Sequence, residues 1–454
     1  MNLQSILKNL PEIEKPVEKK LSFGVKAKWT IIILAAFFVL ANIPLYGLSN
    51  NALERFDNLA VILGTDFGSI ISLGIGPIVM ASIILQLLVG AKILAIDLTS
   101  PEGKRYFQGL QKLLVLFFIV FEASIYVLMR GLEAAPGYAG IVILQLCLGG
   151  LAIMFMDEIT SKWGFGSGVS LFIAAGVSWR LFTALFQFIG PQGGFDPSGR
   201  VLVLFSSIIG GNTTGAILAA AAILITIAIF LFVVWMQSLK IEIPLSFDRI
   251  RGYALKWPLA FFYTSVMPVI LVSALEANIQ LGAGLVEKWQ GHATILGGFS
   301  GGTPISGLAY WLSGVNLLQA TITNSFTSDM ILRVVIHVLF YISFSVLFAT
   351  FWVKTSGMDA QSQAKNIMAS GLTIPGFRKD ERILESVLDR YIMPLTIMGG
   401  ATIGLIAGVT NVVGGLIAGT SFLLVIMVIY QLYQSIAKQH SMDMHPALRK
   451  IIKE

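Results

Sequence analysis

The sequence contains a single cysteine, Cys147, among 454 residues. One cysteine cannot form an intramolecular disulfide and does not support a cysteine-based zinc site. Histidine is almost as scarce, with four residues, and neither an HExxH nor a GxxxxGK[ST] motif occurs. We therefore expect no metal site, no bound cofactor, no nucleotide site and no enzymatic activity.

Charged residues are also scarce, because they make up 12% of the chain against about 25% in an average soluble domain. Apolar residues make up 56%, and adding the 45 glycines raises this share to about 66%, against roughly 45–50% in soluble domains. The mean hydropathy is +0.80. A soluble fold cannot bury that much apolar surface. The composition indicates a polytopic membrane protein.

A helix that crosses a bilayer needs about 20 mostly apolar residues. Ten runs of the sequence approach this length, which predicts an all-α protein with about ten transmembrane helices. The predicted spans are 29–46, 70–90, 107–130, 138–156, 168–189, 214–239, 258–282, 329–353, 391–411 and 414–437.

Lysine and arginine are distributed unequally between the two sides that these spans define. One side holds 24 of the 31 basic residues, and the other holds four, Arg55, Arg130, Arg200 and Lys288. Since basic residues accumulate on the cytoplasmic side of membrane proteins, we expect a multi-pass protein of the cell membrane with both termini in the cytoplasm. The basic side comprises the N-terminal segment 1–28, the loops 240–258 and 356–390, the tail 438–454 and two shorter loops.

Ten spans divide into an N-terminal half, 29–190, and a C-terminal half, 214–437. With five spans each, the second half enters the membrane from the opposite face, so the two five-helix halves are expected to be inverted repeats. The second span of each half contains proline in a similar setting, GIGPIV (Gly74–Val79) and SVMPVI (Ser265–Ile270). Broken spans at corresponding positions point to a central pathway, although ordinary proline kinks also explain them.

The first residues of the chain have a helical apolar stripe. Leu3, Ile6, Leu7 and Leu10 recur at the spacing of one helix face, and Pro11 ends the pattern. Followed by several lysines, this stripe predicts a short helix in the cytoplasmic membrane interface. A frayed tail is the alternative.

Ionisable residues inside the predicted spans are few, the candidates being Glu122, Arg180, Glu276, Arg333 and His337. An inverted-repeat secondary transporter of a small solute is the main alternative function, and it would need a coupling or substrate site near the membrane midplane. Scattered ionisable groups form no obvious relay, so a passive pathway is favoured. A scaffold without a pathway explains the inverted halves poorly.

The two long basic loops are unusual for segments that only set orientation. Loop 356–390 contains Pro375-Gly376, a turn signal that precedes Arg378, Lys379 and Arg382. Basic loop tips suit anionic partners such as lipid headgroups or RNA phosphates. An orientation signal alone remains an alternative explanation of the charge.

Several motifs, in their order and spacing, resemble the SecY family, the large subunits of the protein-conducting channel. The resemblance covers essentially the whole chain and is closer to the archaeal and eukaryotic branch than to the bacterial one. The motifs are ISLGIGPIVMASIILQLL (Ile71–Leu88), GFGSG (Gly164–Gly168), IEIPLSFDRIRG (Ile241–Gly252), ANIQL (Ala277–Leu281) and PGFRK (Pro375–Lys379).

The resemblance implies an hourglass channel between the two halves, closed at its waist by a ring of aliphatic side chains. The matching ring positions are Ile75, Val79, Val169, Ile173, Ile270 and Leu424. The family's plug segment corresponds to Glu54–Thr65, whose apolar residues are Phe56, Leu59, Val61, Ile62 and Leu63.

The resemblance further implies a lateral gate and a set of partners. Gln86 and Asn278 match polar gate positions, where a polar contact across the seam would favour the closed state. Arg249, Arg251, Arg378 and Lys379 lie in the loops that engage the translating ribosome in this family. The other implied partners are SecE-like and beta or SecG-like small membrane subunits, signal sequences, nascent polypeptides and the lipid bilayer. The implied function is to pass unfolded secretory chains across the membrane and to release apolar segments into the bilayer.

Overall fold

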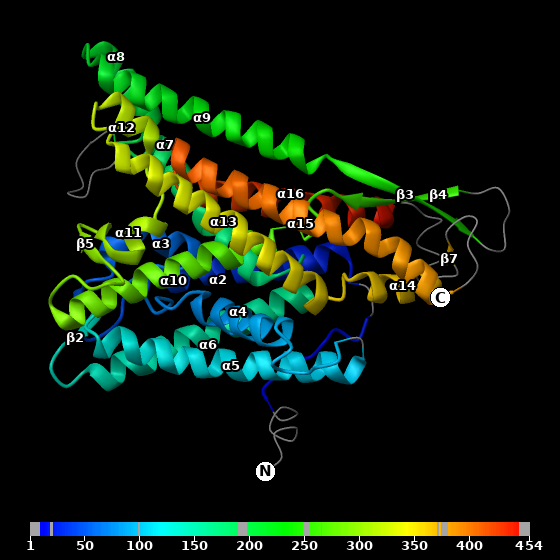
Figure 1. Ribbon diagram of the computed structural model, residues 1–454. Helices are drawn as coiled ribbons and strands as arrows, with labels where there is room; N and C mark the ends of the chain where they lie inside the picture. Colours follow the sequence, from blue (N-terminus) through cyan, green and yellow to red (C-terminus); the bar gives the residue numbers. More distant parts are fainter. Residues whose placement is uncertain are drawn as a thin grey trace.

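The computed structural model describes residues 10–18, 21–98, 100–188, 198–247, 254–264, 266–369, 372–373 and 380–444. Nine of the described helices are long and apolar enough to cross a membrane, and a tenth, α4, is apolar but shorter. Figure 1 shows most of them running between the two ends of the molecule. The ten are α2 (Phe23–Ala41), α4 (Gly76–Gly90), α5 (Pro101–Leu128), α6 (Ala139–Trp163), α7 (Gly168–Phe186), α9 (Thr213–Gln237), α10 (Met267–Gln290), α13 (Ser328–Thr355), α15 (Glu381–Val413) and α16 (Gly419–Met444).

Each of the ten predicted spans corresponds to one of these helices, but three of the helices begin at least five residues later than predicted. In the predicted span 414–437, α16 starts at Gly419. In the predicted span 70–90, only α4 is helical, and residues 70–75 before it are turns. In the predicted span 258–282, α10 starts at Met267 because Ala254–Ala260 form a strand. Since a short apolar run suits a strand as well as a helix, the sequence pattern did not distinguish them.

The two prolines expected to interrupt spans instead lie in the first turns of helices. Pro77 is at the start of α4, and Pro268 is at the start of α10. The first turn tolerates proline because its backbone N–H groups have no partner within the helix. Neither proline is therefore a kink. The second membrane helix of each half begins in the same way, which agrees with two related halves.

Glycines allow α15 to pack tightly on α13. A Cβ atom at Gly404 would lie 2.5 Å from the carbonyl oxygen of Tyr341, and one at Gly408 would lie 3.0 Å from Cα of Val338. The Gly404–Gly408 spacing therefore marks a close helix contact, as such spacings do in membrane bundles. The ninth span is part of a helix of 33 residues, α15.

Short elements cover both ends of the bundle (Figure 1). At one end, β3 (Lys240–Phe247), β4 (Ala254–Ala260) and β7 (Leu372–Thr373) form a sheet in the order β4-β3-β7, beside α14 (Ala360–Ala369). This sheet joins the two long basic loops. The opposite end carries β1 (Leu48–Asn51) paired with β2 (Leu132–Ala134), β5 (Gly298–Ser300) paired with β6 (Thr303–Ser306), and the helices α8 (Arg200–Ile209), α11 (Gly307–Leu312) and α12 (Leu317–Ile322).

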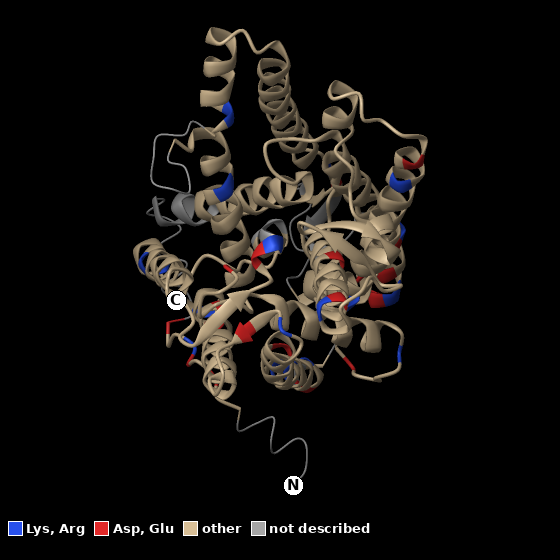
Figure 2. Cartoon of the chain, turned by 90° about the vertical axis from the view of Figure 1, so that its left-hand side faces the viewer, with Lys and Arg blue, Asp and Glu red and all other residues tan. Residues whose placement is uncertain are grey.

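Most of the described ribbon carries neither acidic nor basic residues, as Figure 2 shows. Buried apolar side chains form three clusters, of which the largest draws on helices of both halves. Large apolar side chains such as Leu224, Phe232 and Trp235 of α9 remain exposed. An apolar exterior of this kind is the surface expected of helices that face lipid.

Candidate functional site

The six residues assigned to the pore ring lie in one buried apolar cluster. They come from four helices: Ile75 immediately precedes α4, Val79 is in α4, Val169 and Ile173 are in α7, Ile270 is in α10 and Leu424 is in α16. None of the six is more than 8% exposed. The structure therefore brings together aliphatic side chains from both halves, although positions 75 and 424 are far apart in the sequence.

The plug segment is helical over part of its predicted length. A short 3-10 helix, η1 (Glu54–Phe56), leads into α3 (Asp57–Ile62), and residues 63–65 are not helical. Phe56, Ile62 and Leu63 are buried in the second apolar cluster, and Leu59 packs against it. The side chain of Val61 lies outside the description. Among the described side chains of this segment, these four apolar residues therefore face the interior.

The end of the segment assigned to the plug contacts one of the positions assigned to the ring. The backbone N–H of Ile75 donates to the carbonyl oxygen of Leu63 at 2.9 Å. Gly64 lies against Ile75 and Phe172, since a Cβ atom placed on it would be 3.7 Å from Ile75 Cγ2. Gly74 adopts a left-handed backbone conformation, with φ of +52°, which suits glycine. This turn holds the segment assigned to the plug against Ile75, the residue just before α4.

The start of the plug is held by the C-terminal half, an arrangement that sequence reasoning missed. Arg55 forms an ion pair with Glu287 of α10 at 3.3 Å. Phe56 packs edge-on against Phe299 of β5, with ring centroids 5.1 Å apart. Arg55 and Glu287 are 232 positions apart, so no local sequence signal links them.

The two predicted gate residues lie at a seam between the halves, but they do not pair. Gln86 of α4 is 3% exposed, and its Oε1 atom is buried without a hydrogen-bond partner. The side chain of Asn278 donates to the carbonyl oxygen of Ala274 in its own helix at 2.8 Å. Across the described residues, no hydrogen bond joins Gln86 to Asn278, so these two side chains do not themselves form a polar contact across the seam. An amide in a helix readily bonds the carbonyl four residues earlier, as Asn278 does here, and Oε1 of Gln86 stays without a partner.

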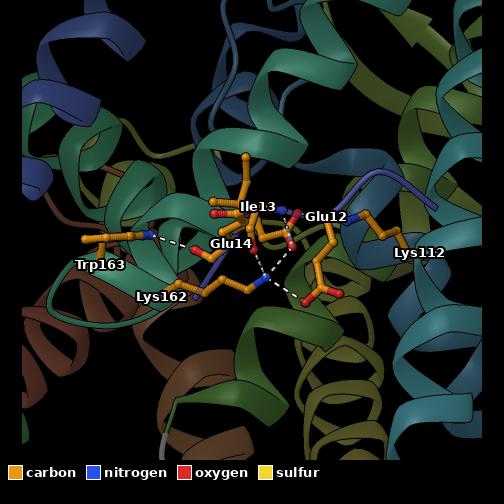
Figure 3. Close-up of polar contacts among 7 residues, drawn as sticks. Glu12, Ile13, Glu14, Lys112, Lys162 and Trp163 are labelled. Atoms are coloured by element: carbon orange, nitrogen blue, oxygen red, sulfur yellow. Dashed lines mark hydrogen bonds and ion pairs between the residues drawn. The ribbon is translucent and has the colours of Figure 1, made fainter. Parts of the chain in front are cut away.

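The described part of the N-terminal segment, residues 10–18, is not helical and docks at the C-terminal end of α6 (Figure 3). Lys162 donates to Glu12 at 2.7 Å, to the carbonyl oxygen of Ile13 and to Glu158 at 2.7 Å. Trp163 donates to the carbonyl oxygen of Glu14 at 3.0 Å. Of the expected interfacial helix, Leu3, Ile6 and Leu7 lie outside the described residues.

This docking is expected to weaken in acid. The hydrogen bond from Lys162 lowers the pKa of Glu12 below its usual value, and the same ammonium faces Glu158, which also pairs with Lys112 at 2.8 Å. A carboxyl group whose pKa is lowered by docking stabilises the docked state at pH values above about 4.3, the pKa of the group in the unfolded chain. This contribution is lost as the pH falls through the lowered pKa. Since the Glu12 side chain is 62% exposed, the effect should be small.

Hydrogen exchange of the Ile13 amide, which donates to Glu158, measures this effect. Its protection relative to a free peptide should be constant from about pH 7 to 5 and decline below about pH 4. Glu12→Gln should lower the protection at neutral pH. Glu14→Gln is the matched control, because Trp163 uses only the backbone of Glu14. Equal behaviour of the two variants would contradict this assignment.

The four residues assigned to ribosome contact, Arg249, Arg251, Arg378 and Lys379, lie outside the described residues. The structure does show that the strands beside them pair. Ser246 of β3 is opposite Thr373 of β7, and Phe247 is opposite Leu372. The two basic loops therefore extend from a shared sheet.

Comparisons with known proteins agree on one family. A family model described as SecY matches residues 69–433. The protein translocase subunit SecY of Methanothermobacter thermautotrophicus is 45% identical over 449 residues, which cover 98% of this chain and 96% of that protein.

Two solved structures are similar over nearly the full chain. One is of a SecY protein whose plug domain stabilises the closed state of the translocation channel and maintains a membrane seal. It has a TM-score of 0.81 and 37% identity, and the match covers 98% of this chain and 99% of that one. The other is Sec61 in the canine ribosome-channel complex from the endoplasmic reticulum, with a TM-score of 0.78, 37% identity and the same coverage.

Proposed function

The chain belongs to the SecY family, and we propose that it is the central pore-forming subunit of a protein translocation channel. It passes unfolded secretory polypeptides across the membrane and releases apolar segments laterally into lipid. The observation that carries this proposal is that all six assigned ring positions, which come from both halves, lie in one buried apolar cluster and that the backbone of one of them, Ile75, is hydrogen-bonded to the plug segment.

The ring suits this task because it is apolar and makes no specific bonds. A narrow apolar constriction excludes water and ions by dewetting, and it can yield to a polypeptide of any sequence. We propose Ile75, Val79, Val169, Ile173, Ile270 and Leu424 as the ring and residues 54–65 as the plug. The plug fills the space beside the ring until a chain displaces it.

We place the lateral gate between α4 and α5 on one side and α10 and α13 on the other. The unpaired Oε1 of Gln86 is a cost to the closed gate, since an unsatisfied buried acceptor costs about 1–3 kcal/mol. Gln86→Leu should therefore stabilise the closed seam, by about 1 kcal/mol, and demand more apolar signal sequences. Asn278→Leu should change this threshold little, because Asn278 bonds within its own helix.

The measurement is export of a reporter carrying a graded series of signal sequences. In the Gln86→Leu variant, half-maximal export of the reporter should require a more apolar signal sequence. Asn278→Leu serves as the matched polar-to-apolar control. A downward shift with Gln86→Leu, or equal shifts in both variants, would contradict the assignment.

We further propose an orientation in the cell membrane with both termini in the cytoplasm. Ten membrane helices place both chain ends on one side, and the basic loops 240–258 and 356–390 lie on that side. In this arrangement the N-terminal segment 1–28 and the tail 438–454 flank the halves 29–190 and 214–437. Arg249, Arg251, Arg378 and Lys379 would then face a translating ribosome, in line with the ribosome-bound canine relative.

The channel is passive in this proposal, with no catalytic activity of its own. The translating ribosome supplies the driving force, and SecE-like and beta or SecG-like small subunits complete the membrane complex. Signal sequences and nascent chains are its substrates.

Site-specific photocrosslinking tests the proposed pathway. Probes at Ile75 and Leu424 should crosslink a stalled nascent secretory chain, and the crosslinks should disappear when its signal sequence is deleted. A probe at Ile227, which is 50% exposed on α9, is the control and should remain without a crosslink. If the protein is folded and binds ribosomes but probes at Ile75 and Leu424 give no crosslinks, the pore assignment is wrong. The secondary transporter then becomes the favoured function.

A further inference from the structure

A polar pocket opens at the proposed gate seam, at the end of the bundle that carries the basic loops. Its volume is about 270 Å³, slightly below the roughly 300–1,000 Å³ of pockets for drug-sized ligands. The lining comes from both halves, with α4 and the segment through α5 on one side and the end of α13 on the other. The lining residues are Ser82, Gln86, Leu98, Lys104, Phe107, Gln108, Gln111, Trp352, Thr355 and Ser356.

Lys104 is the only charged residue in this lining, and no acidic residue accompanies it. In the part of the chain that the structure describes, Lys104 has no ion-pair partner. The pocket therefore offers an ammonium group to an anion. A phosphate group fits this requirement, because Lys binds phosphate as a point charge.

Most of the neutral polar groups in the lining are already bonded. Gln111 donates to Ser82 at 2.7 Å, and the hydroxyl groups of Thr355 and Ser356 donate to carbonyl oxygens of their own helix. Gln86 differs from these four side chains, because its Oε1 is buried and unpartnered. A small rotation of this amide toward the pocket would offer an acceptor to a ligand without breaking an existing bond at Oε1.

We propose that this pocket binds a phospholipid headgroup that carries both a phosphate and a hydrogen-bond donor. The phosphate would pair with Lys104, and a hydroxyl or ammonium of the headgroup would donate to Gln86. Leu98, Phe107 and Trp352 provide apolar contacts for the adjoining glycerol and first methylenes. A lipid is favoured over free phosphate because the pocket opens between membrane helices and includes a tryptophan, a residue typical of the membrane interface.

The site rests on the proposed lateral gate, since its two walls belong to the two sides of the seam. A headgroup that contacts both walls binds the closed seam better than the open one. A bound headgroup therefore favours the closed gate, because a ligand shifts a two-state equilibrium by the difference between its affinities for the two states.

Native mass spectrometry of the full chain with its small subunits, titrated with short-chain lipids, tests the site. Phosphatidylglycerol supplies both phosphate and donor, phosphatidylcholine supplies phosphate without a headgroup donor, and diacylglycerol supplies a hydroxyl without phosphate. Phosphatidylglycerol should bind most tightly. Lys104→Gln should weaken it about tenfold, whereas Arg105→Gln, which removes the neighbouring exposed cation outside the lining, should change binding less than about twofold.

Gln86→Leu provides a second, independent variant, which should abolish the preference for phosphatidylglycerol over phosphatidylcholine. Equal weakening by Lys104→Gln and Arg105→Gln would overturn the site, because it would indicate general surface charge. Sodium phosphate that displaces the lipid completely at equal concentration would overturn the lipid assignment in favour of a free anion. Because the assay measures binding alone, its failure leaves the channel function to the crosslinking experiment.

Discussion

A Gly284→Leu variant is expected to conduct ions at rest, because the new side chain occupies the space that Phe56 of the plug fills. A Cβ atom at Gly284 would lie only 2.4 Å from Cζ of Phe56. Overpacking of this kind costs about 1–3 kcal/mol. If plug displacement relieves it, the balance between seated and displaced plug shifts by about 5- to 150-fold. Single-channel conductance of the purified complex in planar bilayers measures the result.

The same helix provides the control for this variant. Gly282 lies two residues earlier in α10, and a Cβ atom there would meet no atom within 4 Å. Gly282→Leu should therefore leave the resting channel closed. Combining Gly284→Leu with Phe56→Ala should reduce the leak, because the alanine frees the space for the leucine. Similar conductance in the two single variants would show that the contact with Phe56 does not seat the plug.

Ile75→Asn is expected to let ions through the waist of the channel. Ile75 is fully buried in the apolar cluster that contains all six ring positions. An asparagine there places a polar amide in the constriction, which favours water and removes the dewetting barrier. The lost aliphatic contacts and the unsatisfied amide together cost about 2–5 kcal/mol. Ion flux from proteoliposomes with the plug in place, and after its deletion, measures the leak.

Ile71 separates a leak through the ring from general damage to the core. It is also fully buried and belongs to the same cluster, but it is not one of the assigned ring positions. Ile71→Asn should lower thermal stability about as much as Ile75→Asn without raising ion flux. Ile75→Val, which keeps an aliphatic side chain, should remain closed. Equal leaks from the two asparagine variants would remove Ile75 from the ring.

The limits of sequence reasoning are visible at α10 and β4. Residues 258–282 satisfy the length and apolarity of a membrane helix, yet the helix begins only at Met267. Ala254–Ala260 pair instead with Lys240–Ser246 as an antiparallel strand. Such pairing is a non-local interaction, and apolar content alone does not reveal which segment a strand will meet. Local length therefore predicted the existence of the helix but not its start.

The gate shows a similar limit for polar side chains. The family resemblance identified Gln86 and Asn278 as residues of the seam, and the structure places Gln86 on helix α4 beside a pocket shared by both halves. The two side chains share no hydrogen bond among the described residues, and Asn278 instead donates to Ala274 within its own helix. Side-chain partners depend on distances of a few tenths of an ångström, which residue identity does not determine.

By itself, the sequence determined the class of this protein, its ten membrane helices, the inverted halves and, through resemblance, the family. These properties follow from local composition, since about 20 apolar residues suffice to favour a membrane helix and the count of spans sets the relation between the halves. Only the tertiary structure decided how the plug is held, through Arg55, Glu287 and Phe299, and that Gln86 has an unpaired oxygen. These contacts join residues far apart in the chain, and they exist only once the helices have packed at fixed distances.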